Sequence, residues 1–283
     1  MANEPHLDDH LDTFLNRLAR DPAVLVTVLS SRGSVPREAG TWMAVFADTQ
    51  VGTIGGGQLE WDALRQARGR LPGHPEPAWE QAVALGPSLG QCCGGSLVLG
   101  FQRLQATDVA DLRERLAPVL TPVALFGGGH VGHALVRALA PLPFCTTWID
   151  SRDGVFPAQL PGHVQTEHSD PVQGAVADLS PGARVLIMSF SHAEDLDIVA
   201  ACLQRQRQRA DLPFVGLIGS RSKWARFRHR LAERGFTEAE LAHVTCPIGL
   251  PGIRGKEPAV IAASVVAQLL LLPAAGTATG HGP

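Results

Sequence analysis

Apolar residues recur along this chain at two spacings, and these spacings predict its helices and strands. In residues 7–20, Leu11, Leu15 and Leu18 fall on one face at helical intervals, which predicts an amphipathic helix. Short runs rich in β-branched residues predict strands instead. The first half of the chain is therefore expected to contain strands at 23–29, 41–46, 51–54 and 96–101, and helices at 58–68 and 107–116. The pattern of residues 79–85 fits either a helix or a strand.

Strands and helices alternate regularly after residue 122. The predicted strands cover 123–126, 144–149, 183–189 and 214–218, and further helices are predicted at 194–209, 221–231 and 258–272. This alternation favours a parallel sheet, whose binding crevice lies at the carboxyl ends of its strands. We therefore predict an α/β fold class, with an N-terminal α/β domain over 1–118 followed by a Rossmann-like parallel-sheet domain over 119–273. Residues 274–283 are predicted to form a disordered tail.

A glycine motif of the form G-x-G-x-x-G joins the first of these later strands to its helix. Gly127 permits a tight turn, Gly129 lets the backbone approach a phosphate, and Gly132 lets the helix pack closely on the strand. The helix N-terminus offers N–H groups to an anion, and His130 lies beside it. Asp150 ends the next strand ~20 residues later, where a carboxylate would bind a ribose hydroxyl. These residues form a candidate nucleotide or anion site.

Three more residues lie near strand ends in the same domain. Arg221 and Lys223 open a predicted helix directly after a glycine and a serine, where a phosphate would be welcome. The alternative is an ordinary solvated first helical turn. His192 follows another strand end and is either catalytic or without a special role.

The charge and hydropathy of the whole chain exclude several classes of function. The chain has 283 residues, 45% of them apolar, and a formal net charge of −3. It has no long basic run, which argues against a nucleic-acid partner. It has no uncharged apolar run of ~20 residues, which argues against a membrane span. Its first residues lack the basic start and apolar core of a signal peptide, so we expect a cytoplasmic protein.

Five cysteines are present, and two of them, Cys92 and Cys93, are adjacent. The odd count and irregular spacing argue against a disulfide framework. This pair follows Gln91 and precedes two glycines in a segment without periodicity, where backbone N–H groups would stabilise a thiolate. Thiolates are soft ligands that suit transition metals or sulfur transfer. The alternative is that one cysteine merely starts the next strand; of the two, Cys93 is the preferred functional candidate.

Two further features of the first domain could hold an anion. Arg37 lies in a loop rich in glycine and proline, and its guanidinium could clamp an anionic group through two hydrogen bonds. Its alternative is an ordinary surface arginine paired with Glu38. Gly55, Gly56 and Gly57 separate a strand from a helix, so their backbone N–H groups could face an anion. Their alternative is a plain turn.

Seven motifs along the chain together resemble the xanthine dehydrogenase accessory protein family of the XdhC and CoxI type. The motifs are Gly33-Ser-Val-Pro-Arg-Glu-Ala-Gly40, Gly52-Thr-Ile-Gly-Gly-Gly-Gln-Leu-Glu60, Leu89-Gly-Gln-Cys-Cys-Gly-Gly95, Phe126-Gly-Gly-Gly-His-Val-Gly132, Ile149-Asp-Ser-Arg-Asp153, Gly216-Leu-Ile-Gly-Ser-Arg221 and Pro247-Ile-Gly-Leu250. They occur in order, and the resemblance covers nearly the whole chain.

The resemblance implies a cofactor-binding and insertion chaperone rather than an enzyme. Such a protein receives a molybdopterin-type molybdenum cofactor from an upstream biosynthesis protein and supports its sulfuration by a cysteine desulfurase. It then inserts the cofactor into the molybdenum subunit of apo xanthine dehydrogenase, and a homodimer is also implied. The cofactor-binding candidates are then Cys93, Cys92, Arg37, Gly55, Gly56, Gly57 and Gln91. Cys93 would be the molybdenum contact.

A second hypothesis stays open from the residues alone. An NAD(P)-dependent oxidoreductase would use the Rossmann-like domain and would depend on Asp150, whereas the chaperone would depend on Cys93. The sequence does not decide which glycine loop holds the cofactor, nor whether the Rossmann crevice also takes a nucleotide.

Overall fold

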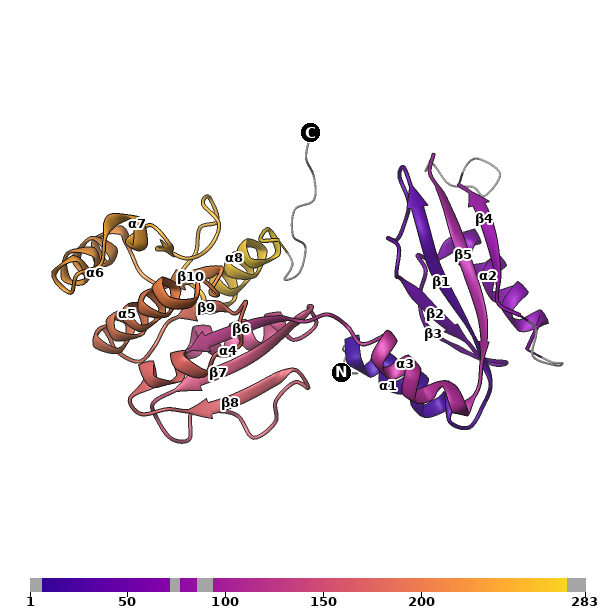
Figure 1. Ribbon diagram of the computed structural model, residues 1–283, viewed down its shortest axis with the longest axis horizontal. Coiled ribbons are helices and arrows are strands. Elements are labelled where there is room, and N and C mark those ends of the chain that lie inside the picture. The colour runs from indigo at the N-terminus through magenta and orange to yellow at the C-terminus, as the bar shows by residue number, and fades with distance from the viewer. Residues whose placement is uncertain (1–6, 72–76, 86–93, 274–283) are drawn as a thin grey trace. The chain divides into compact units, whose positions relative to one another are not determined.

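The computed structural model describes residues 7–71, 77–85 and 94–273 (Figure 1). Gln91, Cys92, Cys93 and the predicted tail at 274–283 lie outside the described residues. The chain divides into two compact units, Met1–Pro118 and Val119–Pro283, which we call the N-terminal unit and the C-terminal unit. Among the described helices, none is both long enough and apolar enough to cross a bilayer.

The N-terminal unit is built on an antiparallel sheet of five strands in the order β3-β2-β1-β5-β4. The strands are β1 (Ala23–Arg32), β2 (Trp42–Val45), β3 (Gln50–Gly52), β4 (Trp79–Ala84) and β5 (Ser96–Leu104). Helix α2 (Gly57–Gly69) covers one face, and α1 (Leu7–Leu18) and α3 (Val109–Arg115) cover the other. The alternation of β1 produces this arrangement, because Val24 and Val26 face α2 while Leu25 faces α1.

The C-terminal unit contains a parallel sheet of six strands in the order β11-β10-β9-β6-β7-β8. The strands are β6 (Thr121–Phe126), β7 (Phe144–Asp150), β8 (Val164–His168), β9 (Arg184–Ile187), β10 (Phe214–Leu217) and β11 (Val244–Thr245). The sheet starts in its middle at β6 and grows outward in both directions. This order is that of the doubly wound dinucleotide-binding fold, and it places the crevice between the carboxyl ends of β6 and β9.

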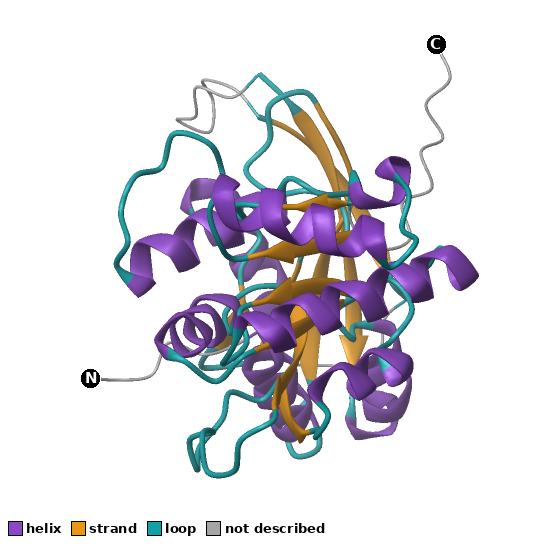
Figure 2. Ribbon diagram, turned by 90° about the vertical axis from the view of Figure 1, so that its left-hand side faces the viewer, coloured by secondary structure: helices purple, strands orange, loops and turns teal. Residues whose placement is uncertain are grey.

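Helices cover both faces of this parallel sheet, and Figure 2 shows them in purple beside the orange strands. Helices α4 (His130–Leu139) and α8 (Pro258–Leu270) pack on one face against Val123 and Leu125. The other face carries α5 (His192–Arg209), α6 (Arg221–Glu233), α7 (Glu238–Leu241) and a 3-10 helix, Val172–Asp178. Ala124 and Phe126 point to that side. The predicted fold class, an α/β unit followed by a Rossmann-like unit, is confirmed.

Several elements differ from the sequence prediction. The ambiguous segment 79–85 contains the edge strand β4, and β1 continues through Arg32 into the predicted loop. The predicted helix 107–116 begins as a 3-10 turn, Ala106–Asp108, whose N-cap is Gln105. Strands β8 and β11 and the helix Val172–Asp178 were not predicted.

Candidate functional site

The glycine motif of the C-terminal unit forms a close-packed turn. A Cβ atom on Gly127, whose φ is +124°, would lie 2.0 Å from the Met188 carbonyl oxygen. A Cβ atom on Gly132 would lie 2.1 Å from the Gly127 carbonyl oxygen, which also accepts a hydrogen bond of 2.9 Å from the Trp148 indole. Both glycines are therefore required by packing. Gly129, the N-cap of α4, has no atom within 4 Å of its Cβ position, so its backbone is accessible.

Asp150 lies beside this turn and is almost completely buried, at 2% exposure. Its Oδ2 accepts hydrogen bonds from the Gly128 N–H at 2.5 Å and from the Arg152 guanidinium at 2.9 Å. Its Oδ1 accepts from the Arg152 backbone N–H and Nε, both at 2.9 Å. Burial raises the pKa of the Asp150 carboxyl, but the hydrogen bonds from Arg152 and Gly128 outweigh burial and lower it below its usual value. The carboxylate is thus ionised and engaged at both oxygens.

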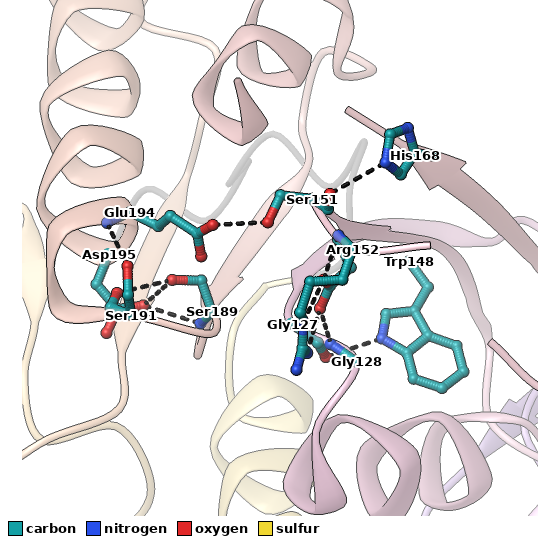
Figure 3. Close-up of polar contacts among 11 residues, drawn as sticks. Gly127, Gly128, Trp148, Ser151, Arg152, His168, Ser189, Ser191, Glu194 and Asp195 are labelled. Atoms are coloured by element: carbon teal, nitrogen blue, oxygen red, sulfur yellow. Dashed lines mark hydrogen bonds and ion pairs between the residues drawn. The ribbon is translucent and has the colours of Figure 1, made fainter. Parts of the chain in front are cut away.

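Arg152 therefore already uses both carboxylate oxygens to which a ribose hydroxyl would have to donate. Figure 3 shows its guanidinium beside Gly127 and Gly128. The guanidinium also lies over the exposed Phe190 ring, with Cζ 4.5 Å from the ring centroid. Sequence reasoning missed this role, although Arg152 lies in one of the quoted motifs. Nucleotide binding by Gly127, Gly129, His130, Gly132, Asp150 and Arg221 stays a prediction.

The other predicted residues of this rim are separated into exposed and buried groups. His130, His192 and Arg221 are the first residues of α4, α5 and α6, and all three are exposed. Lys223, in contrast, is 7% exposed and donates to Asp195 Oδ2 at 2.5 Å and to the Ile218 carbonyl at 2.9 Å. The expectation that the Lys223 ammonium faces a phosphate is therefore wrong, because it is held inside the unit by a buried carboxylate.

Asp195 completes a network that ties strand ends to helix starts. Its Oδ1 accepts from both the N–H and the hydroxyl of Ser189, each at 2.8 Å (Figure 3). Ser191 caps α5 by accepting from the Glu194 N–H, and Glu194 in turn accepts from the Ser151 hydroxyl at 2.6 Å. The network fixes the carboxyl ends of β7 and β9 relative to α5. The side chains of this network hydrogen-bond to one another, so their role is to hold the strand ends that border the crevice.

In the N-terminal unit, close glycine contacts bring three of the quoted motifs together. A Cβ atom on Gly55 would lie 2.7 Å from the Pro36 Cβ. A Cβ atom on Gly95 would lie 2.4 Å from the Ser34 carbonyl oxygen, and one on Gly33 would lie 3.2 Å from the Gly95 Cα. The loop at 33–37 therefore adjoins both the loop at 53–57 and residues 94–95. Cys92, Cys93 and Gln91 precede Gly94 in sequence but lie outside the described residues.

The turn at Gly55, Gly56 and Gly57 is stabilised from within by Glu60, which sequence reasoning did not single out. The Glu60 carboxylate accepts from the Ile54 and Gly56 N–H groups at 3.0 and 3.1 Å. It also accepts from the side chains of Thr53 and Gln50. Burial raises the pKa of the Glu60 carboxyl, but these hydrogen bonds outweigh burial and lower it. The Glu60 carboxylate thus already accepts from the Gly56 N–H, one of the three that we expected to face an anion.

Arg37 is exposed, and within the described residues its side chain makes no ion pair, including with Glu38. It sits beside Gly55, whose Cβ position is 3.5 Å from the Arg37 Cγ. The backbone at Gly56 is also open, since no atom lies within 4 Å of its Cβ position. The convergent loops therefore present an available guanidinium beside accessible backbone.

The three cysteines of the C-terminal unit are protonated thiols rather than free thiolates. Burial raises the pKa of the Cys202 thiol to about 12 and that of Cys246 to about 11, and it also raises the pKa of Cys145. Cys202 is fully buried in the core, and Cys145 is half-buried. Across the ranges that the structure describes, no three His, Cys, Asp or Glu side chains cluster as metal ligands.

These features define a two-unit α/β protein, in which an antiparallel unit with convergent glycine loops precedes a Rossmann-type unit. Residues 123–269 match the model of the XdhC Rossmann domain, and residues 17–78 match that of the XdhC and CoxI family. The chain belongs to the XdhC and CoxI family.

Two known proteins are similar over most of the chain. The uncharacterized protein YqeB of Escherichia coli K12 is 27% identical over 254 residues, which is 88% of this chain but 43% of YqeB. The chain thus spans less than half the length of this curated relative. The crystal structure of a xanthine dehydrogenase from Bacillus halodurans has a TM-score of 0.72 and 20% identity. The matched region covers 92% of this chain and 94% of the Bacillus halodurans chain, and this similarity supports the assigned fold.

Proposed function

We propose that this chain is a chaperone that holds a molybdopterin-type molybdenum cofactor and delivers it to apo xanthine dehydrogenase. Membership of the XdhC and CoxI family suggests an accessory role toward xanthine dehydrogenase. The observation that carries the finer proposal is that the loop at 33–37, which carries the exposed Arg37, contacts both Gly55 and Gly95. Three motifs that are distant in sequence are thus brought together through this loop, as expected for a binding site.

The residues present in this unit fit the anionic part of such a cofactor. Arg37 would hold its phosphate, because a guanidinium binds phosphate through two charge-assisted hydrogen bonds. The open backbone at Gly56 would let a flat ligand approach closely. The Ile54 and Gly56 N–H groups already donate to the Glu60 carboxylate. Arg37 is therefore the main group in this region that could bind an anion.

Cys93, with Cys92 beside it, would supply the soft ligand in this proposal. A thiolate suits both molybdenum and a labile sulfur, so Cys93 is the proposed molybdenum contact and Gln91 a neighbouring polar contact. When bound, the cofactor would supply the molybdenum centre that the dehydrogenase requires. The chain would receive it from an upstream biosynthesis protein and present it to a cysteine desulfurase for sulfuration. We place these steps in the cytoplasm and expect the chain to act as a homodimer.

The alternative, an NAD(P)-dependent oxidoreductase, has less support from the geometry of the C-terminal unit. A ribose hydroxyl would have to replace Arg152, whose guanidinium makes two hydrogen bonds to a nearly buried Asp150. Nucleotide binding in this crevice would therefore cost an ion pair whose carboxylate is buried and whose guanidinium is 35% exposed. A carrier without turnover of its own needs no such exchange.

Co-purification tests the proposal. Wild-type protein from cells that make molybdenum cofactor is expected to carry nearly stoichiometric pterin and molybdenum. Cys93→Ala should lose both with an unchanged melting temperature, and Arg37→Ala should bind about tenfold more weakly because a charge-assisted contact is lost. Arg20→Ala is the matched control, since Arg20 is an exposed arginine of the same unit.

Two results would contradict the proposal. The first is a wild-type protein without pterin, or one whose pterin survives both Cys93→Ala and Arg37→Ala. The second is NAD(H) or NADP(H) binding that Asp150→Ala abolishes, which would make the Rossmann crevice the active site.

A further inference from the structure

The C-terminal unit contains a cavity of about 300 Å³. It lies at the carboxyl ends of β10 and β11, and neither Gly127 nor Asp150 lines it. Its walls are the loop at 247–255, the start of α8 and Arg221, the first residue of α6. A volume of this size is at the lower end of the range for small-molecule sites.

The hydrogen bonds of the loop hold the cavity open in one shape. The Gly249 N–H donates to Gln268 Oε1 at 2.7 Å, and the Leu250 N–H donates to the Ser264 hydroxyl at 2.8 Å. Both acceptors belong to α8, so the loop is pinned to that helix. The Ile248 N–H donates to the Leu217 carbonyl at 3.1 Å, which pins the loop to β10 as well. Residues 248–250 of the lining are therefore held in place before a ligand binds, so binding would cost little entropy in this part of the loop.

Glycine packing confirms that the loop is fixed. A Cβ atom on Gly216 in β10 would lie 2.5 Å from Ile248 Cδ1. A Cβ atom on Gly249, whose φ is +102°, would lie 2.6 Å from the Ser264 hydroxyl oxygen. Only glycine at these two positions allows the loop to pack so closely on β10 and α8.

The lining combines apolar walls with one charge. Ile248, Leu250, Val260 and the half-exposed Ile253 contribute apolar surface. Arg221 is the charged side chain in the lining, it is exposed, and within the described ranges it makes no ion pair. A guanidinium beside an apolar wall, with no carboxylate in the lining, favours a ligand that is anionic at one end and apolar at the other.

We propose that this cavity binds a small organic anion, with its carboxylate, sulfonate or phosphate on Arg221 and its apolar or aromatic body against Ile248 and Val260. This site is independent of the proposed molybdenum cofactor site, because it uses no cysteine and belongs entirely to the C-terminal unit. It gives the Rossmann-type unit a ligand of its own.

The test uses anilinonaphthalene sulfonate, a fluorescent aromatic anion, titrated into the full chain. Arg221→Ala should weaken its binding about tenfold, whereas Arg226→Ala, an exposed arginine on the same helix, should leave it unchanged. The uncharged parent compound, phenylnaphthylamine, should bind the wild type about tenfold more weakly than the sulfonate. Val260→Trp should abolish binding, because the larger side chain fills the cavity from α8 while Arg221 stays in place.

The proposal is overturned if Arg221→Ala binds the sulfonate as tightly as the wild type, or if the uncharged compound binds equally well. It is also overturned if Val260→Trp keeps its binding. Because Arg221 is exposed, its substitution tests the charge without disturbing the fold, even where the tryptophan variant proves unstable.

Discussion

At the scale of single residues, Asp150 is the most tightly held functional candidate. Four hydrogen bonds from Arg152 and Gly128 converge on a side chain that is 2% exposed. The Asp150→Asn variant keeps the shape but removes the charge from these bonds. We expect it to lower the free energy of unfolding by about 2 kcal/mol at neutral pH, because hydrogen bonds to charged groups are the stronger ones. Urea unfolding measures this difference.

The same substitution has a defined dependence on pH. The folded-state pKa of Asp150 is lowered from its usual value of 3.8, so its stabilisation is present above that value and is lost as the pH falls through the folded pKa. The difference in the free energy of unfolding between the wild type and Asp150→Asn should therefore become smaller at acid pH. Asp153→Asn is the control, because the Asp153 side chain is 97% exposed and its loss should cost at most ~0.5 kcal/mol. A constant difference across pH would refute the assigned role of the charge.

At the scale of elements, the junction of β6 and α4 contains glycines with different roles. Gly132→Ala should lower the free energy of unfolding by about 2 kcal/mol, because its Cβ would lie 2.1 Å from the Gly127 carbonyl oxygen. Gly129→Ala should lower it by about 1 kcal/mol or less, since space is open there and only the N-cap preference changes. Thermal unfolding of the two variants separates them, and equal losses would contradict this account.

The ends of β9 and β10 depend on a buried ion pair. Lys223→Met leaves the Asp195 carboxylate buried without its cation, so we expect the free energy of unfolding to fall by about 3 kcal/mol. The double variant that adds Asp195→Asn should be less destabilised than Lys223→Met alone, because no uncompensated charge remains. Urea denaturation of both variants measures the difference. A double variant that is less stable than the single one would show that the pair is not the source of the effect.

The sequence predicted those elements whose pattern is local. The spacing of Gly127, Gly129 and Gly132 predicted the turn after β6, because glycine spacing reports backbone geometry directly. Strand β8 was missed because only Val164 among its residues is buried, so it has no apolar run or alternation to detect. The roles of Arg152 and Glu60 were missed for another reason. Which group a long polar side chain contacts depends on the folded arrangement, and no spacing rule encodes it.

At the scale of the whole molecule, each unit has its own core. The clusters around β1 and β5 contain residues of the N-terminal unit alone, and those around β6 and β9 contain residues of the C-terminal unit alone. A chain segment with a complete core of its own is expected to fold without the other segment. Both units lie within the usual range of domain sizes, so neither is too small to bury a sufficient core.

We therefore expect the full chain to unfold in two thermal transitions, one for each unit. Residues 119–283, expressed alone, should fold and should melt at the temperature of one of these two transitions. Hydrogen exchange should show the same protection of β6 and β9 in both forms, because their neighbours in the sheet are all present. Gly132→Ala should then lower only that transition and leave the other unchanged. A single cooperative transition in the full chain, shifted as a whole by Gly132→Ala, would show instead that the two cores depend on each other.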